Sequence, residues 1–220
     1  IMSSNNVVRG LAIFNWDRQI ELYGSGARRN RVEGNFIGTN AAQLFQSSNL
    51  GTHHSEGLRI QVGASYNVVG CGSFAPDNSF VPCSDPAQAY AARNIVAGNG
   101  NDGIHLERPV FHNRIVGNYI GLKQDGETVN RNRSDGVDFE QGSQHNWLGG
   151  ESVLERNVIS GNDSEGIEIS HGTWTQFNKV VGNYFGLNAA GTAPVPNKNN
   201  GISFEDTVDQ NEAYNNVVSG

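Results

Sequence analysis

The sequence is poor in several residue types that soluble domains normally use. Its 220 residues contain one Met, two Cys and three Lys, and hydrophobic residues make up only 36%, below the usual share for a globular domain. No apolar run is long enough to span a bilayer, and no signal peptide is recognisable. The net charge of −7 argues against a nucleic-acid-binding protein, which would show a basic face. It also makes a polyanionic sugar a poor direct partner without bridging cations or a local basic patch.

The two cysteines, Cys71 and Cys83, bracket a stretch rich in Gly, Pro and Ser (CGSFAPDNSFVPC). We interpret them as a disulfide that closes this stretch, which implies an oxidising, extracellular compartment. Two buried free thiols are the alternative. Residues 71–93 are accordingly predicted to form a loop insertion in the main architecture.

Asparagine and glycine are present in surplus, 28 of each, and they recur at fixed intervals. The segment NIVAGN at 94–99 returns as NVISGN at 157–162, and VGNYIGL at 116–122 returns as VGNYFGL at 181–187. These intervals of 63 and 65 residues mark an internal repeat. Between them lies a Gly-apolar-x-apolar element, which begins at Gly57, Gly103, Gly136, Gly166 and Gly201.

Each repeated element is too short for a helix and alternates with the period of a strand. Gly and Asn-Gly pairs separate the elements and supply positive-φ corners. Three strands make one coil, so the repeat corresponds to two coils of alternating type. The sequence predicts an all-β fold, a single-stranded right-handed parallel β-helix of about six three-strand coils that takes up residues 1–220 as one solenoid. Because the chain begins abruptly and stops inside a recognisable repeat, we expect it to be a segment of a longer protein.

Residues that recur at one slot in coil after coil are predicted to be structural. Asparagine recurs at one corner of alternate coils, at Asn35, Asn118 and Asn183. It also recurs just before the second strand of successive coils, at Asn30, Asn67, Asn113, Asn146 and Asn178. Stacked in register, these amides can hydrogen-bond along the solenoid axis as an asparagine ladder. The acidic residue before the strand glycine recurs at Glu56, Asp102, Asp135 and Glu165, and we assign it to turn formation.

The repeat resembles that of the pectate-lyase-like superfamily of right-handed parallel β-helices, over nearly the whole chain. This resemblance implies a secreted protein, in a superfamily that includes polysaccharide lyases, hydrolases and epimerases as well as phage tailspikes and adhesins. Its catalytic motifs are not matched here. Ser170-His171-Gly172 has only part of the Gly-His-Gly of polygalacturonases, and Arg108-Pro109 lacks the second Arg of the pectate lyase pattern. No site residue is therefore carried over from the superfamily.

One strand face is not explained by the repeat. In the Gly-apolar-x-apolar-x strands the two x positions point outward. The first outward column reads Glu21, Arg59, His105, Asp138, Glu168 and Ser203, and the second reads Tyr23, Gln61, Glu107, Glu140, Ser170 and Glu205. We expect Glu107 to stack on Glu140 and Asp138 on Glu168, although like charges directly opposite one another destabilise a sheet.

Two arrangements would relieve this repulsion. A cation, with calcium the best fit, could be bound by Asp138, Glu140 and Glu168, and it is the one cofactor that the sequence suggests. Alternatively, one carboxyl stays protonated beside its neighbour, as a general acid/base pair requires. Glu107, Asp138, Glu140 and Glu168 are then the catalytic candidates, with His105 as a further participant. Solvated carboxylates that splay apart are the third interpretation. The six histidines lack the spacing of zinc ligands.

Long loops are expected to flank this face. Segments 39–56, 122–135 and 187–200 leave from one corner and would form one wall, while the turns that follow the strands carry aromatic and imidazole groups and would form the other. Rings stack on apolar sugar faces and polar groups hold hydroxyls. We therefore expect substrate contacts from Tyr23, Arg59, Gln61, His145 and Trp174.

Two functional hypotheses follow from these features. The first is a secreted, carbohydrate-active β-helix that binds a polysaccharide or surface glycan along the acidic face and cleaves it as a hydrolase or lyase. The second is a non-catalytic structural or adhesive segment of a large cell-surface protein, in which the solenoid is a spacer. Neither hypothesis involves nucleic acid or membrane insertion.

Overall fold

The chain forms a single-stranded parallel β-helix, as the repeat predicted. The computed structural model describes residues 1–42 and 55–220. Sheet A contains β1 (Val7–Arg9), β4 (Arg31–Glu33), β7 (Val68–Gly70), β12 (Arg114–Val116), β15 (Trp147–Gly149), β18 (Lys179–Val181) and β21 (Glu212–Tyr214). Sheet B contains β2 (Ala12–Ile13), β5 (Phe36–Ile37), β10 (Ile95–Val96), β13 (Tyr119–Ile120), β16 (Val158–Ile159), β19 (Tyr184–Phe185) and β22 (Val217–Val218). Sheet C contains β3 (Arg18–Tyr23), β6 (Glu56–Gln61), β11 (Ile104–Glu107), β14 (Val137–Phe139), β17 (Ile167–Ile169) and β20 (Ile202–Phe204).

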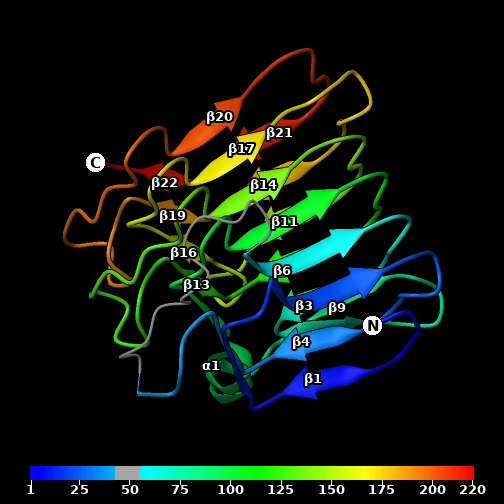
Figure 1. The fold of residues 1–220 in the computed structure, drawn as a ribbon, viewed down its shortest axis with the longest axis horizontal. Coiled ribbons are helices and arrows are strands. Elements are labelled where there is room, and N and C mark those ends of the chain that lie inside the picture. The colour runs from blue at the N-terminus through cyan, green and yellow to red at the C-terminus, as the bar shows by residue number, and fades with distance from the viewer. Residues whose placement is uncertain (43–54) are drawn as a thin grey trace.

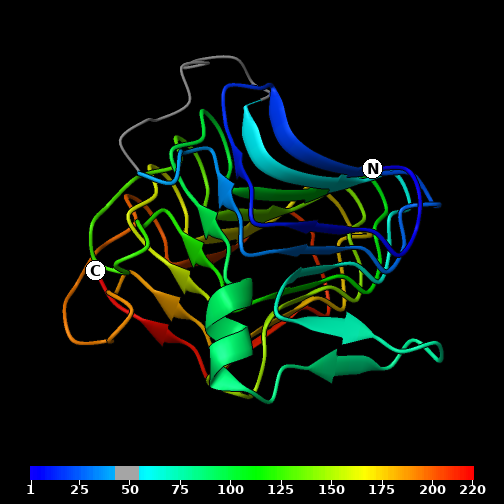
Figure 2. The same ribbon diagram turned by 90° about the horizontal axis from the view of Figure 1, so that it is seen from below.

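The chain visits the three sheets in turn, so each circuit lays one strand on each sheet. All pairings within sheets A, B and C are parallel and join strands of adjacent circuits. Six complete coils and the first two strands of a seventh are present in the described chain. Figure 1 shows sheet C stacked in chain order from β3 to β20, and Figure 2 looks along the stack. The two-coil period is confirmed. The repeated segments 94–99 and 157–162 contain β10 and β16, and in sheet B the strand β13 of the intervening coil lies between them.

Apolar side chains of the alternating strands fill the interior. The two apolar residues of each Gly-apolar-x-apolar element are fully buried in β6, β11, β14 and β17. The glycine that precedes them permits close contact between coils: a Cβ at Gly136 would lie 2.5 Å from Ile159 Cγ2 and 2.7 Å from the Gly166 carbonyl oxygen. No larger residue fits that position without moving the neighbouring coil.

Asparagine ladders run along the corners. In one ladder the amides of Asn30, Asn67, Asn113, Asn146 and Asn178 are linked in series by side-chain hydrogen bonds of 3.0–3.1 Å. The ladder predicted at alternate coils is continuous, because Asn94 and Asn157 fill the positions between Asn35, Asn118 and Asn183. A third ladder, at Asn99, Asn132, Asn162 and Asn197, was not predicted.

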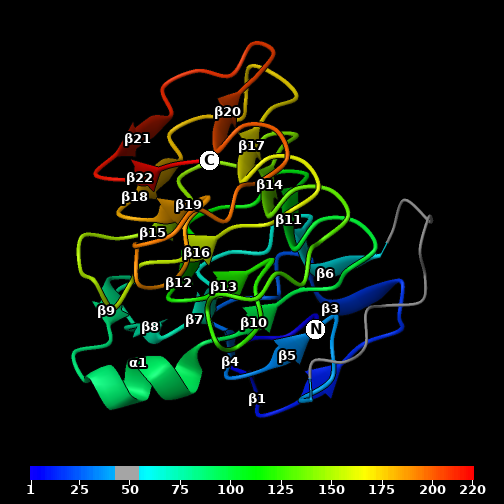
Figure 3. The same cartoon turned by 90° about the vertical axis from the view of Figure 1, so that its left-hand side faces the viewer.

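The insertion at 71–93 has more structure than a loop. Cys71 and Cys83 form the predicted disulfide, which closes the open end of the antiparallel pair β8 (Gly72–Phe74) and β9 (Phe80–Pro82); α1 (Pro86–Ala92) follows shortly after Cys83. Asp85 caps this alanine-rich helix by accepting a hydrogen bond from the Ala87 amide at 2.9 Å, and Pro86 occupies the first turn, both favourable to helix initiation. Figures 2 and 3 place the hairpin and the helix on the side of the solenoid away from sheet C.

Candidate functional site

The unexplained residues form two columns on sheet C in the predicted register. The strand pairing places Arg59 beside His105, His105 beside Asp138, and Asp138 beside Glu168. In the second column Gln61 pairs with Glu107. Glu140 follows β14 directly and its amide continues the ladder to Leu106, so Glu107 and Glu140 are neighbours as expected.

Most of these side chains are buried, which contradicts a purely solvated face. Arg59, His105, Glu107, Asp138 and Glu140 are all less than 9% exposed. Their charges are partly compensated, because Arg59 forms ion pairs with Glu107 and, at 3.0 Å, with Glu56. The Arg59 guanidinium is thus the direct partner of Glu107, a relief of the carboxylate repulsion that the sequence did not predict.

His105 occupies the centre of the cluster. Its Nε2 lies 3.0 Å from Glu140 Oε1 and 3.5 Å from Asp138 Oδ2. On the other side of the ring, Nδ1 lies 3.6 Å from Asp102 Oδ2 and 3.7 Å from Glu56 Oε1. Four carboxylates from three coils therefore surround one imidazole.

This environment moves the pKa values of the cluster in opposite directions. Burial lowers the pKa of His105, but the hydrogen bond to Glu140 and the nearby carboxylates of Glu56, Asp138 and Asp102 outweigh burial and raise it well above its ordinary value. Burial raises the pKa of Asp138, and the attraction of His105 does not offset it, so the net shift is well upward. Burial also raises the pKa of Glu140, but the hydrogen bond and charge of His105 and the charge of His171 give a net lowering.

The side chains on this face of sheet C are more exposed in the coils that follow. Glu168 is half-buried, and its pKa is raised by burial and by the charges of Glu205 and Glu165 against a lowering hydrogen bond from Ser170. The His171 side chain is 58% exposed, and its Nδ1 lies 3.1 Å from Glu140 Oε2. Trp174 is 70% exposed in the turn after β17, and its Cβ lies 3.7 Å from the position of a Cβ at Gly142. Trp174 therefore lies beside the turn at Gly142, two residues after Glu140 in the chain.

The residues expected to contact substrate divide into two groups. Tyr23 and Trp174 are exposed as that role requires. Arg59 and Gln61 are buried, and the Gln61 amide donates to Glu21, so both are engaged within the protein. His145 is not on this face: its ring stacks between His112 and Phe177 at centroid distances of 5.0 Å and lines a small cavity with Arg114 and Trp147.

The three residues expected to bind calcium are not brought together as one group. Among residues 1–42 and 55–220, Glu168 forms a cluster of possible ligands with Asp135 and Glu165, whereas Asp138 clusters with Asp102 and His105, and Glu140 with His105 and Glu107. The expected calcium triad is therefore split between three sets of neighbours.

Two residues of the cluster were assigned only to the turns. Asp102 does serve its corner, since its Oδ1 accepts the Asp135 amide at 3.1 Å, but its other oxygen faces His105. Glu56 faces His105 and Arg59. The signal was the spacing: each acidic corner residue precedes an ionisable column residue by three positions, as in Glu56/Arg59 and Asp102/His105.

Of the long loops expected to wall this face, residues 43–54 of the first lie outside the described residues. The loops at 122–135 and 187–200 each contain an antiparallel bridge, Leu122 to Val129 and Leu187 to Pro194. They leave sheet B at equivalent corners of alternate coils, as predicted.

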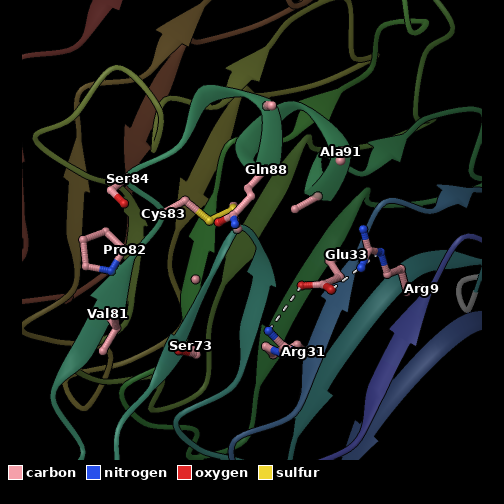
Figure 4. Close-up of a pocket in the computed structure, with 14 residues that line it drawn as sticks. Arg9, Arg31, Glu33, Ser73, Val81, Pro82, Cys83, Ser84, Gln88 and Ala91 are labelled. Carbon is pink, nitrogen blue, oxygen red and sulfur yellow. Dashed lines mark ion pairs between the residues drawn. A yellow bond between two sulfur atoms is a disulfide. The ribbon is translucent and has the colours of Figure 1, made fainter.

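A cleft of about 720 Å³ lies elsewhere, beneath the disulfide-linked hairpin (Figure 4). Sheet A contributes Arg9, Arg31 and Glu33 to one wall, and the insertion contributes the other. Both guanidiniums point toward Glu33, at 3.8 and 3.9 Å. This cleft contains none of the predicted catalytic residues.

Comparison with known proteins does not extend the assignment. Within the described segments, no helix has the length and apolar character needed to cross a membrane. No protein-family model matches the chain, and searches of curated proteins and of solved structures found no significant match. The chain is thus identified as a parallel β-helix by its three stacked sheets and its asparagine ladders.

Proposed function

We propose that this β-helix is a secreted, carbohydrate-active protein that binds a polysaccharide across the open part of the sheet C face and hydrolyses it. The observation that carries the proposal is a pair of carboxyls on adjacent coils in different surroundings: Glu140 lies between two imidazoles, 3.0 Å from His105 and 3.1 Å from His171, whereas the half-buried Glu168 has no ion pair among the described residues. In keeping with this, the pKa is lowered at Glu140 and raised at Glu168. A pair of carboxyls whose environments separate their pKa values is suited to act as base and acid. Glycoside hydrolysis uses such a pair.

In this proposal Glu140 is the carboxylate and Glu168 the proton donor. His105 and His171 hold Glu140 ionised through contacts of 3.0 and 3.1 Å. Glu168 is half-buried at the margin of the cluster. The exposed indole of Trp174 offers a stacking surface for a sugar ring. The Cys71–Cys83 disulfide weakly favours an oxidising compartment.

Replacement of the two carboxyls tests this assignment. Glu140→Gln and Glu168→Gln should each reduce the release of reducing ends from a panel of polysaccharides by about 10²–10⁴-fold, with far-UV circular dichroism unchanged. Trp174→Ala should mainly raise KM, because it removes a binding contact. Glu151→Gln, an exposed acid outside the site, is the matched control. Full activity in both glutamine variants would overturn the assignment.

The pH dependence gives a second test. Hydrolysis requires ionised Glu140 and protonated Glu168, so activity should rise as pH passes the lowered pKa of Glu140 and fall as pH passes the raised pKa of Glu168. In Glu168→Gln the residual activity should lose its alkaline limb. An unchanged alkaline limb in that variant would exclude Glu168 as the acid.

The non-catalytic spacer is the alternative, and the burial of Arg59, His105 and Glu107 favours it. Buried and mutually paired charges can serve the architecture of a coil without touching a ligand. If no glycan is bound or cleaved by the unaltered chain, the spacer is the better account of this molecule.

A further inference from the structure

One side of the His105 imidazole is not hydrogen-bonded. The side chain is only 9% exposed, and its Nδ1 atom has no hydrogen-bond partner in the part of the chain that the structure describes. The same holds for Asp138 Oδ1 and Glu56 Oε2. An unpaired buried polar group is destabilising, and more so when it is charged, so three of them in one cluster call for a ligand.

The spacing around Nδ1 is that of metal ligands rather than hydrogen-bond partners. Asp102 Oδ2 and Glu56 Oε1 lie 3.6 and 3.7 Å from it, beyond the hydrogen-bonding range. Two donors bound to one ion at about 2.0–2.2 Å are about 2.8–3.6 Å apart at octahedral or tetrahedral angles. Asp102, His105 and Asp138 each offer a ligand atom, and all three atoms lie within 4.8 Å of one another.

The opposite side of the ring has the partner that such a site requires. A histidine bound to a metal through one nitrogen usually donates its other N–H to a carboxylate, which fixes the orientation of the ring. His105 Nε2 lies 3.0 Å from Glu140 Oε1. Arg18, Arg108 and His171 pair with Glu56, Glu107 and Glu140 at the margin of the cluster, whereas Asp102 and Asp138 have His105 as their ion-pair partner.

We propose that Asp102 and the Nδ1 atom of His105 bind a divalent transition-metal ion such as zinc or manganese, with Asp138 of the next coil as the third candidate ligand, Glu56 beside the site and Glu140 orienting the histidine. An imidazole with carboxylates suits these ions, whereas calcium prefers oxygen ligands alone. The residues come from two successive coils, and neither Asp102 nor the imidazole was among the ligands expected from the sequence. This inference does not depend on the proposed hydrolysis, since binding can be measured without any glycan.

Calorimetric and thermal titration of the metal-free chain with ZnCl2, MnCl2, CaCl2 and MgCl2 tests the site. We expect one zinc or manganese ion per chain and a higher melting temperature, because a ligand that binds the folded state stabilises it. His105→Gln and Asp102→Asn should weaken affinity by more than about 100-fold, and Glu140→Gln by about 10–100-fold as an outer-shell partner. Glu168→Gln is the matched control and should bind as the unaltered chain does, because Glu168 belongs to a different carboxylate cluster.

If a variant fails to fold, nitrogen NMR of the unaltered chain still tests the site. In the unaltered chain, zinc should shift the 15N resonance of His105 Nδ1 while Nε2 keeps its proton. No binding of zinc or manganese, binding of calcium or magnesium instead, an unshifted Nδ1 resonance, or loss of binding in Glu168→Gln would each overturn the proposal.

Discussion

Ionisable side chains at the corners of the coils have a double role. Asp135 Oδ1 accepts the backbone amide of Glu165 at 2.8 Å, and Asp102 accepts that of Asp135. These bonds tie each corner to its neighbour, but they also stack carboxyls above one another. Burial and the charge of Asp102 raise the pKa of Asp135 to about 8, so this carboxyl is protonated at neutral pH.

Asp135→Asn should therefore remove a pH-dependent loss of stability. Between the pKa of the unfolded chain, near 4, and about 8 in the folded chain, the folded state holds a proton that the unfolded state lacks. Stability consequently falls as pH rises through this window. Asparagine cannot ionise and still accepts the Glu165 amide, so the variant should gain stability relative to the unaltered chain from pH 5 to pH 8.5, by on the order of a few kcal/mol.

Urea unfolding at pH 5 and pH 8.5 measures this difference. Asp163→Asn is the control, since Asp163 is paired with Arg131 on the surface at 2.7 Å. Parallel changes of stability with pH in the unaltered chain and Asp135→Asn would contradict a raised pKa at this carboxyl.

The insertion at 71–93 is an element that packs on the solenoid without being part of a coil. A small apolar cluster of Cys71, Ala89 and Ala92 lies beneath it, with Cys83 and Leu154 against its edge. The main core runs through the coils and includes none of these residues. The hairpin and helix can therefore open while the solenoid stays folded.

Loss of the disulfide should act on this element alone. In Cys71→Ser/Cys83→Ser the constraint on a loop of 12 residues is removed, which corresponds to roughly 2–3 kcal/mol of local stability. Limited proteolysis should cut between residues 72 and 92 much faster, while the melting temperature of the β-sheet signal changes by only a few degrees. A large fall in that temperature would show that the disulfide stabilises the coils themselves.

Across the whole molecule, stability comes from repeated contacts between neighbouring coils. In repeat architectures each unit is stabilised by the unit on either side. Asn146 illustrates this: its Oδ1 accepts from the Asn113 backbone amide and side chain at 2.9 and 3.0 Å, and its own amide donates to Val110 O and Asn178 Oδ1. One fully buried side chain thus joins three consecutive coils.

The same substitution should cost more in the middle of a ladder than near its end. Asn146→Ala leaves buried groups unpaired and should destabilise the chain by at least about 3 kcal/mol. Asn211→Ala, in the same ladder but only half-buried, should cost about 1 kcal/mol. Thermal unfolding monitored by circular dichroism compares the two, at roughly 2–4 °C per kcal/mol for a chain of this size. Equal costs would contradict stabilisation by neighbouring coils.

The sequence by itself determined the coil, its two-coil period, the ladder along Asn30–Asn178 and the register of the sheet C columns. All of these follow from local spacing, because strand period and corner residues repeat along the chain. The α1 helix was not predicted, because a short alanine-rich segment shows neither the strand period nor the repeated corner residues of the coils.

Only the tertiary structure decided which column residues meet and how deeply they lie. Arg59 reaches Glu107 across 48 positions, His105 reaches Glu140 across 35, and Asp102 turns one oxygen from its corner toward the imidazole. His145 instead joined a ring stack at another corner. The spacing along each strand specifies which side chains point outward. The partner that each side chain contacts, and how deeply it is buried, depend on the residues of neighbouring coils. For that reason the acidic face and His105 were visible in the sequence, while the central position of this histidine among four carboxylates and the unpaired side of its ring were not.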